Sequence, residues 1–199
     1  MEAPEINTTS YESDRLILRK PTIADKGELL DYRQEFIDNG EVGCGDGELI
    51  NTENIDEWFK KIEIYSNDKT VPKNRVAATQ FIAVRKSDNK IVGMVNVRHR
   101  LNETLLLYGG HIGDNVRKSE RGKGYATEQI CLALKFCKKL GIDKVLITCD
   151  RENIASRKSI IKNNGVKENE VFVDGITYER FWVLTGSTEI CNTDRRQLI

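Results

Sequence analysis

A glycine-rich turn that opens directly into a helix is the feature that most limits how this chain can fold. Residues 116–126 read Val-Arg-Lys-Ser-Glu-Arg-Gly-Lys-Gly-Tyr-Ala, after an apolar stretch and before a helical run over residues 125–140. The first turn of a helix has unpaired backbone N–H groups at the positive end of its dipole. Cationic side chains accompany this turn, at Arg117, Lys118, Arg121 and Lys123. The pattern predicts a strand–turn–helix unit that binds an anion such as a phosphate or pyrophosphate.

Two common phosphate-binding loops do not fit this segment. The dinucleotide pattern G-x-G-x-x-G requires a third glycine where Thr127 stands, and no stretch of the chain matches the Walker pattern G-x-x-x-x-G-K-[ST]. What does match is Arg-x-x-Gly-x-Ala, at Arg121, Gly124 and Ala126. This resembles the acetyl-CoA pyrophosphate loop of the GNAT acetyltransferase superfamily. By itself, so short a match leaves open a basic, glycine-rich helix start without a ligand.

Other segments resemble the same superfamily. The passage Ile-Thr-Cys-Asp-Arg-Glu-Asn-Ile-Ala-Ser at residues 147–156, followed by Gly165, resembles the branch that contains ribosomal-protein N-terminal acetyltransferases, and so does the opening stretch 15–19 before Pro21. Segments 97–103 and 108–113 are similar to a less characterised bacterial group of predicted acetyltransferases. The resemblance runs from about residue 14 to residue 185 in the expected order, which a chance motif would not do.

Composition excludes several classes of protein. A chain of 199 residues is most simply one domain, and its 31 basic and 31 acidic residues cancel, so no overall field favours nucleic acid or a membrane. No N-terminal apolar leader and no apolar run near the length of a membrane span is present. The five cysteines are odd in number and lack C-x-x-C spacing, which disfavours a disulfide framework or a zinc site. We expect a reduced, soluble, cytoplasmic protein with no metal, nucleic-acid or membrane partner.

Local signals along the chain predict alternating strands and helices of an α/β protein. Strands are expected at 15–19, 77–85, 91–99, 105–116, 144–149, 171–173 and 178–184, and helices at 22–39, 54–66, 125–140 and 154–163. The strands 77–85 and 91–99 should form a hairpin, and Asp174-Gly175 predicts the turn of a closing hairpin. Asn54 and Glu57 are placed as a capping box, and Gly141 is expected to end the helix 125–140. The glycine-rich segment 41–51 reads as a mobile loop. With the resemblance, this predicts a GNAT-like mixed, mostly antiparallel central sheet of about six or seven strands. Helices would cover both faces, and a splayed strand pair would admit the pantetheine arm.

The predicted organisation has three parts. Residues 1–13 form a loose N-terminal segment, residues 14–185 a single acyl-CoA N-acyltransferase domain, and residues 186–199 a polar C-terminal tail.

The resemblance implies an N-acetyltransferase that moves an acetyl group from the cosubstrate acetyl-CoA to a primary amine, by direct attack through a tetrahedral intermediate. A lysine-like amine costs about 4–5 kcal/mol to deprotonate at pH 7, so a base is useful. A backbone N–H around residues 115–117 would hold the oxyanion. The residues implied in cofactor binding are Asn115, Val116, Arg117, Arg121, Gly122, Lys123, Gly124, Tyr125, Ala126, Asn153 and Lys158. For Asn153 a helix cap, and for Lys158 a solvated helix face, are equally open.

Two residues are predicted to be catalytic. His111 occupies the position where the related branch often has a glutamate, and histidine titrates near neutral pH. Packing on a strand is the alternative, and Asp114 and Glu103 are weaker candidates for the base. Ser156 is the candidate general acid, because isoleucines stand where many GNAT enzymes place a tyrosine, although a serine early in a helix is often a cap.

Two other functions stay open at this point. A non-catalytic acyl-CoA-binding module would explain the missing tyrosine, and a nucleotide-binding oxidoreductase-like domain would explain the glycines. The second requires a strand that runs directly into the glycines, whereas residues 117–121 intervene. The acceptor is expected to be a small-molecule or peptide amine whose identity cannot be read from the sequence. The closing hairpin could pair two copies as a homodimer.

Overall fold

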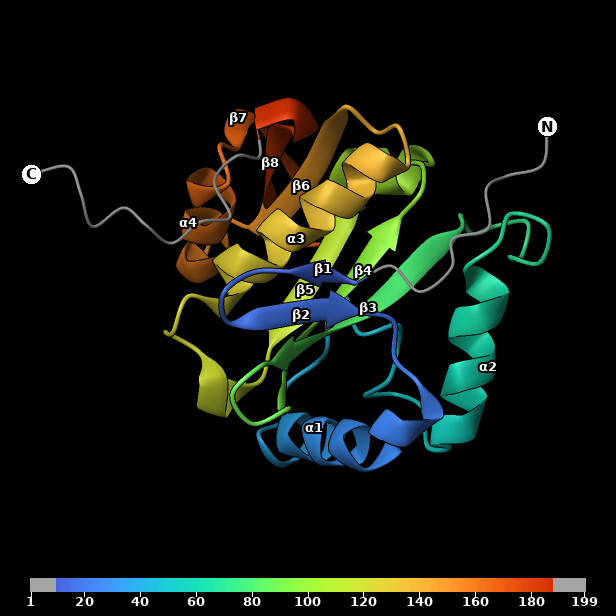
Figure 1. Ribbon diagram of the computed structural model, residues 1–199. Helices are drawn as coiled ribbons and strands as arrows, with labels where there is room; N and C mark the ends of the chain where they lie inside the picture. The colour runs from blue at the N-terminus through green and yellow to red at the C-terminus, as the bar shows by residue number, and fades with distance from the viewer. Residues whose placement is uncertain (1–9, 188–199) are drawn as a thin grey trace, which may run out of the picture.

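The computed structural model describes residues 10–187 and contains two antiparallel sheets (Figure 1). The first sheet has five strands, in the order in which they occur in the chain. These are β1 (Tyr11–Glu12), β2 (Leu16–Arg19), β3 (Ala78–Arg85), β4 (Ile91–Arg98) and β5 (Ile112–Val116). The β3–β4 hairpin is the predicted one, and its strands are buried over most of their length because helices cover both faces.

The second sheet has three strands in the order β6-β8-β7. They are β6 (Lys144–Asp150), β7 (Val166–Val173) and β8 (Ile176–Leu184). The turn between β7 and β8 is the predicted Asp174-Gly175 pair, and both residues have positive φ, 50° and 84°. Two consecutive positive φ values are typical of the tight hairpin turn that Asp-Gly favours.

Four α-helices accompany the sheets: α1 (Lys26–Asp38), α2 (Ile55–Tyr65), α3 (Tyr125–Lys139) and α4 (Ile154–Lys162). Short 3₁₀ turns lie at Ile23–Asp25, Lys118–Glu120 and Thr185–Ser187. The predicted terminator Gly141 follows α3 with φ of 76°. Asn54 caps α2 as predicted, but its side chain accepts from the N–H of Asp56 at 2.9 Å rather than from Glu57.

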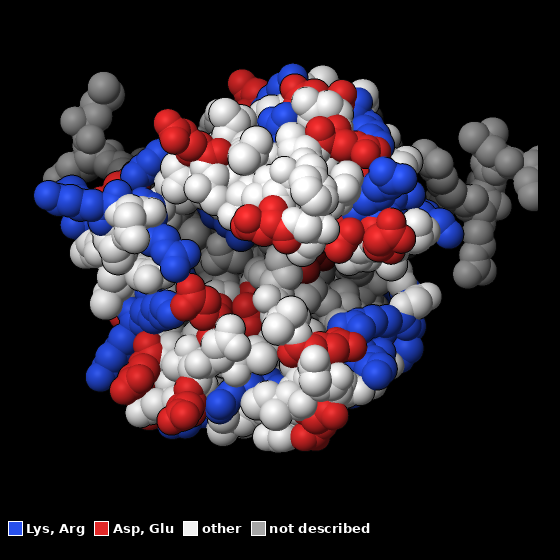
Figure 2. Space-filling view, turned by 180° about the vertical axis from the view of Figure 1, so that it is seen from behind, with Lys and Arg blue, Asp and Glu red and all other residues white. Residues whose placement is uncertain are grey.

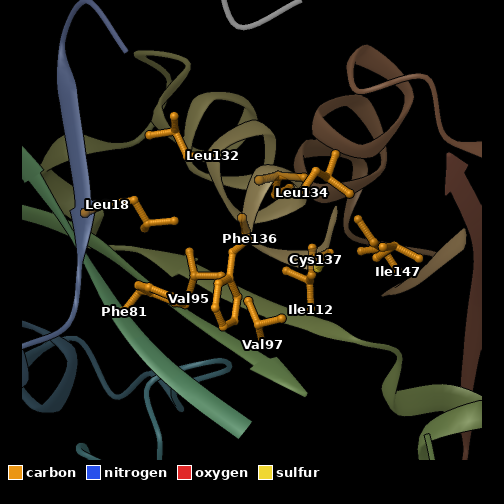
Figure 3. Close-up of a cluster of buried hydrophobic side chains, with 14 of the residues drawn as sticks. Leu18, Phe81, Val95, Val97, Ile112, Leu132, Leu134, Phe136, Cys137 and Ile147 are labelled. Atoms are coloured by element: carbon orange, nitrogen blue, oxygen red, sulfur yellow. The ribbon is translucent and has the colours of Figure 1, made fainter. Parts of the chain in front are cut away.

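The two faces of the first sheet carry separate apolar clusters. One cluster packs α3 against the first sheet and β6, and Figure 3 shows Phe136 of α3 beside Val95 and Phe81, with Cys137 and Leu134 of α3 on the side of Ile147. The other lies under α1 and α2 and contains Tyr32, Phe36 and Trp58. This arrangement confirms the predicted GNAT-like fold with helices on both faces.

Four local expectations are corrected by the structure. The described strands number eight rather than six or seven, and β1 lies inside the segment expected to be loose, where it pairs with β2. Residues Leu105–Gly109 form a π-helix instead of the start of a strand. Segment 41–51 is packed rather than a mobile loop, since Leu49 is fully buried and the Trp58 ring N–H donates to the carbonyl of Asp46 at 3.0 Å. Most of the predicted tail, residues 188–199, lies outside the described residues.

Two further findings concern cysteines and membranes. Cys44, Cys137 and Cys149 are free thiols, whereas Cys131 on α3 is disulfide-bonded, which the number and spacing of the cysteines did not predict. Between residues 10 and 187, no helix has the length and apolar character needed to span a bilayer.

Candidate active site

The two sheets meet at one point and diverge beyond it. Within residues 10–187, their only backbone hydrogen bond runs from the N–H of His111, just before β5, to the carbonyl of Leu146 on β6, at 2.7 Å. The N–H of Leu146 donates in turn to His111 Nδ1 at 2.9 Å. From there to Val116 and Asp150 no ladder joins β5 to β6. The predicted splayed strand pair is therefore present.

Register along β5 identifies the backbone groups that face the open side. The N–H of Arg117 donates to Val92 of β4 at 3.1 Å, and Asn115 lies opposite Met94. Because alternate residues of an antiparallel strand point their N–H groups toward the partner, the N–H of Val116 points away from β4. Of the three residues predicted to offer an oxyanion donor, only Val116 has an N–H on the edge that faces β6.

The start of α3 lies next to this edge and carries no side-chain cap. Gly124 is the N-cap residue, with φ of 84°. At Gly122, whose φ is 77°, a Cβ would meet no atom within 4 Å. Glycine tolerates positive φ without strain, so this turn exposes the first N–H groups of α3. The backbone N–H groups predicted to bind a phosphate are thus accessible.

Two of the cationic side chains of the turn form ion pairs with carboxylates. Lys123 Nζ lies 2.7 Å from Glu120, and Arg121 forms a two-point ion pair with Glu41. Burial would raise the pKa of Glu120, but hydrogen bonds from Lys123 and Arg85 outweigh it and lower the pKa to about 2. These pairs hold the turn in shape.

Arg117 has a structural role that differs from the predicted one. Its side chain is 6% exposed, bonds to Glu35 of α1 at 2.6 Å, and lies over the ring of Tyr32. A guanidinium buried between α1 and β5 cannot contact a phosphate at the start of α3. The sequence prediction missed this role because the partner of Arg117, the Glu35 carboxylate, lies 82 positions away in the chain.

Arg15 is a member of the site that the sequence did not reveal as one. It bonds to Glu128 of α3 and donates to the carbonyl of Lys123 at 2.9 Å. Its guanidinium also lies 4.8 Å from the ring centre of Tyr125. Tyr125 itself is buried in the core, so its side chain supports the turn and only its backbone is available to a ligand. The neighbouring Ala126 is partly buried against the same core.

The family comparison is decisive at this point. The model of the acetyltransferase (GNAT) domain matches residues 15–167. The chain belongs to the GNAT acetyltransferase family. It is an acyl-CoA-dependent acetyltransferase, with acetyl-CoA as the acetyl donor, and this excludes the oxidoreductase-like alternative.

Solved structures agree with this GNAT assignment at the level of the fold. Ribosomal-protein-S5-alanine acetyltransferase from Vibrio fischeri is 16% identical, with a TM-score of 0.63 over 91% of this chain and 99% of its own. The microcin C7 self-immunity acetyltransferase MccE, solved with acetyl-CoA and AMP, is 18% identical, with a TM-score of 0.61 over 86% and 93%. A spermidine N-acetyltransferase SpeG chimera from Vibrio cholerae and hSSAT is 18% identical, with a TM-score of 0.57 over 87% of this chain and 98% of its own. No functionally curated protein matches the sequence.

His111, the predicted base of this GNAT enzyme, instead joins the two sheets. Burial lowers its pKa to about 4, and the positive charge of Arg98 acts in the same direction. Since Nδ1 accepts the N–H of Leu146, the proton of the neutral ring is on Nε2. That nitrogen then has no free lone pair, so His111 cannot accept a proton without breaking its bond to β6.

Ser156 and Asn153 lie at the start of α4. Asn153 is the N-cap, and its Oδ1 accepts from the N–H of Ser156 at 3.0 Å. Ser156 is partly buried and lies near the Cys149 thiol at the end of β6. Burial raises the pKa of this thiol to about 11, so Cys149 is a neutral thiol at pH 7 and a poor nucleophile. Lys158, on the same helix, is exposed.

The two weaker candidates for the base, Glu103 and Asp114, lie in different surroundings. Glu103 is exposed and lines a surface pocket together with Lys73 and Arg75. Asp114 lies on β5 and is partly buried, and it accepts from Gln129 of α3 at 2.9 Å. Desolvation raises its pKa to about 6. No sequence pattern signals this burial, because a lone aspartate in a strand is usually solvated.

A hollow crosses the face of the molecule opposite α3. Figure 2 shows it between the part that carries α1, below, and the part that carries the second sheet, above, with both acidic and basic side chains on its rim. The rings of Tyr108 of the π-helix and Tyr178 of β8 pack against each other, with ring centres 5.2 Å apart.

Proposed function

We propose that this enzyme acetylates a primary amine by direct attack on acetyl-CoA in the cleft between β5 and β6. The observation that carries the proposal is the divergence of these strands beyond the contact between His111 and Leu146. It leaves the N–H of Val116 on an open edge beside the uncapped start of α3. An extended pantetheine arm can pair with such an edge as an added strand would.

The turn before α3 fits the pyrophosphate of acetyl-CoA. The backbone N–H groups of residues 122–126 would hold it, because no side chain caps them and Gly122 leaves the space in front of them open. Arg121, Lys123 and Lys158 are the side chains of the predicted set that are exposed enough to add charge. Arg121 is 46% exposed and Lys123 49% exposed even when paired with Glu41 and Glu120.

Two chemical demands of the transfer, support for the oxyanion and a proton for the thiolate, have a group beside this cleft. The N–H of Val116 donates to the carbonyl oxygen as negative charge develops there. The neutral amine attacks the carbonyl carbon to form a tetrahedral intermediate, and the C–S bond breaks as this intermediate collapses to the amide. The Ser156 hydroxyl donates a proton to the departing thiolate, and the proton that the amine nitrogen loses returns to Ser156 through water. Asn153 fixes the first turn of α4 and with it the position of Ser156.

We propose a cationic amine as the acceptor. The acidic side chains among the charged groups on the rim of the hollow in Figure 2 favour a positively charged group, and aromatic rings such as those of Tyr108 and Tyr178 can bind a cation on their faces. The names of the structural neighbours, a spermidine and a ribosomal-protein alanine acetyltransferase, supply two chemical classes to test: a polyamine and a peptide N-terminus.

The test is release of CoA from acetyl-CoA in the presence of spermidine, of a peptide with N-terminal alanine, and of an N-terminally blocked lysine peptide. We expect one of these amines to give CoA and N-acetyl product in equal amounts, with the product mass confirmed by mass spectrometry. An N-acetylated version of the same acceptor is the matched control and should release no CoA. Tight binding of acetyl-CoA without transfer to any amine would contradict the proposal and favour a non-catalytic acyl-CoA-binding module.

A further inference from the structure

The reaction in the cleft requires a proton acceptor. The nearby carboxylates differ in how many hydrogen bonds and ion pairs already hold them. Glu41 is held by Arg121, and Asp46 accepts the N–H groups of Glu48 and Ile50 at 3.2 and 3.1 Å. Asp114 differs, because within residues 10–187 its only side-chain partner is the neutral amide of Gln129. One carboxylate oxygen, Oδ1, has no hydrogen bond there.

Asp114 is also placed close to the reacting groups. It precedes Val116 by two residues on β5, which corresponds to about 6.5 Å along a strand. Its side chain lies on the side of the sheet that α3 covers, and the residue is partly exposed.

The side chain of Gln129 is held in place beside Asp114 by burial and hydrogen bonds. It is fully buried, and its Nε2 donates both to Asp114 Oδ2 at 2.9 Å and to the carbonyl of Asn115 at 3.0 Å. Gly93 of β4 makes room for it, since a Cβ at that residue would lie 2.2 Å from Gln129 Oε1. The amide thus links the helix that begins at the phosphate turn to the strand that carries Asp114.

We propose that Asp114 is the general base of this acetyltransferase and that Gln129 is its positioning residue. This inference rests on the proposed function. Asp114 takes a proton from the ammonium form of the acceptor, the freed nitrogen lone pair forms the C–N bond, and the C–S bond breaks as the thiolate is protonated. Asp114 then returns its proton to water.

The electrostatic surroundings favour a base that works near neutral pH. Burial raises the pKa of Asp114 to about 6, against the hydrogen bond from Gln129, which lowers it. The titratable groups that interact electrostatically with it are Tyr32 of α1 and Cys44 of the packed loop; burial raises the pKa of both, so both are neutral at pH 7. The guanidinium of Arg98 of β4 lies beside Gly113, the residue before Asp114.

The first arm of the test needs no acceptor. Carbon-13 NMR of the aspartate carboxyls in the free enzyme should show Asp114 titrating near pH 6, identified by its loss in Asp114→Asn. In Gln129→Met, which removes the donor but keeps the side-chain volume, the titration should move to higher pH. Gln34→Met, on an exposed position of α1, is the matched control and should leave it unchanged. Titration of Asp114 near pH 4 in the wild type would overturn the proposal.

The second arm is the pH profile of kcat/KM with whichever acceptor is acetylated. The wild-type profile should rise with pH and bend near pH 6, and Gln129→Met should move the bend upward. Asp114→Asn should lower kcat/KM about 100-fold or more and remove the bend, with unchanged acetyl-CoA binding. It should also raise Tm at pH 8 but not at pH 4, because a raised carboxyl pKa weakens the folded state only where the group is ionised. Retained kcat/KM in Asp114→Asn would overturn the inference, whereas an inactive wild type would instead contradict the proposed function.

Discussion

Replacing Gly124 by glutamate should weaken acetyl-CoA binding at least about 100-fold, which corresponds to about 2.7 kcal/mol. Gly124 is the N-cap of α3, and its φ of 84° is a conformation that side chains disfavour. Glutamate adds a negative charge and a bulky chain at the end of the helix where we place the pyrophosphate. Isothermal titration with acetyl-CoA measures the effect directly.

Two controls separate charge from backbone strain in this prediction. Gly124→Ala introduces the strain alone, since a Cβ there would only reach Arg15 at 3.5 Å, an ordinary contact, and binding should fall much less. Gly141→Glu places the same side chain on a glycine with φ of 76° at the other end of α3, and it should bind acetyl-CoA like the wild type. Binding by Gly124→Glu within about threefold of wild type would show that the turn is not the phosphate site.

Replacing Gly45 by alanine should destabilise the protein by about 3 kcal/mol or more, the sum of left-handed backbone strain and overpacking. Gly45 has φ of 78°, and a Cβ there would lie 2.1 Å from the carbonyl oxygen of Gly113. The packed loop and β5 therefore touch through two glycines, next to Asp114. If the backbone of the loop or of β5 shifts to make room for the Cβ, it also displaces β5, which borders the cleft. We therefore expect kcat/KM to fall as well.

The matched control for this variant is Gly141→Ala. Gly141 has nearly the same φ, 76°, but a Cβ there meets no atom within 4 Å, so only about 1–2 kcal/mol is expected. Urea unfolding of both variants provides the comparison. Equal losses would mean that the close approach of Gly45 to Gly113 is absent in solution.

Short-range patterns accounted for most of the fold. The Asp174-Gly175 turn, the glycine after α3 and the helical spacing of α3 each depend on residues a few positions apart, and the structure has all three where they were predicted. The segment from Leu105 was misassigned because a short apolar run suits a strand or a buried helix equally well.

The parts of the site that the sequence did not reveal depend on distant partners. Arg117 was assigned to the ligand because it is next to the turn, but Glu35 of α1 binds it. His111 was assigned to catalysis because of its residue type, but Leu146 occupies its Nδ1. Asp114 was ranked low because neither its burial nor its contact with Gln129 can be seen in one strand. The chemical type of each residue could be read from the sequence, whereas the partner that each side chain binds in the fold could not.

The central claim is that acetyl-CoA binds along the open edge of β5 and at the start of α3. Amide NMR of the ¹⁵N-labelled protein during titration with acetyl-CoA tests it most directly. The N–H signals of Val116 and of residues 122–126 should shift most, while those of α2 and the β7–β8 hairpin stay in place. Shifts confined to the α2 region, with Val116 unmoved, would contradict this account of the site.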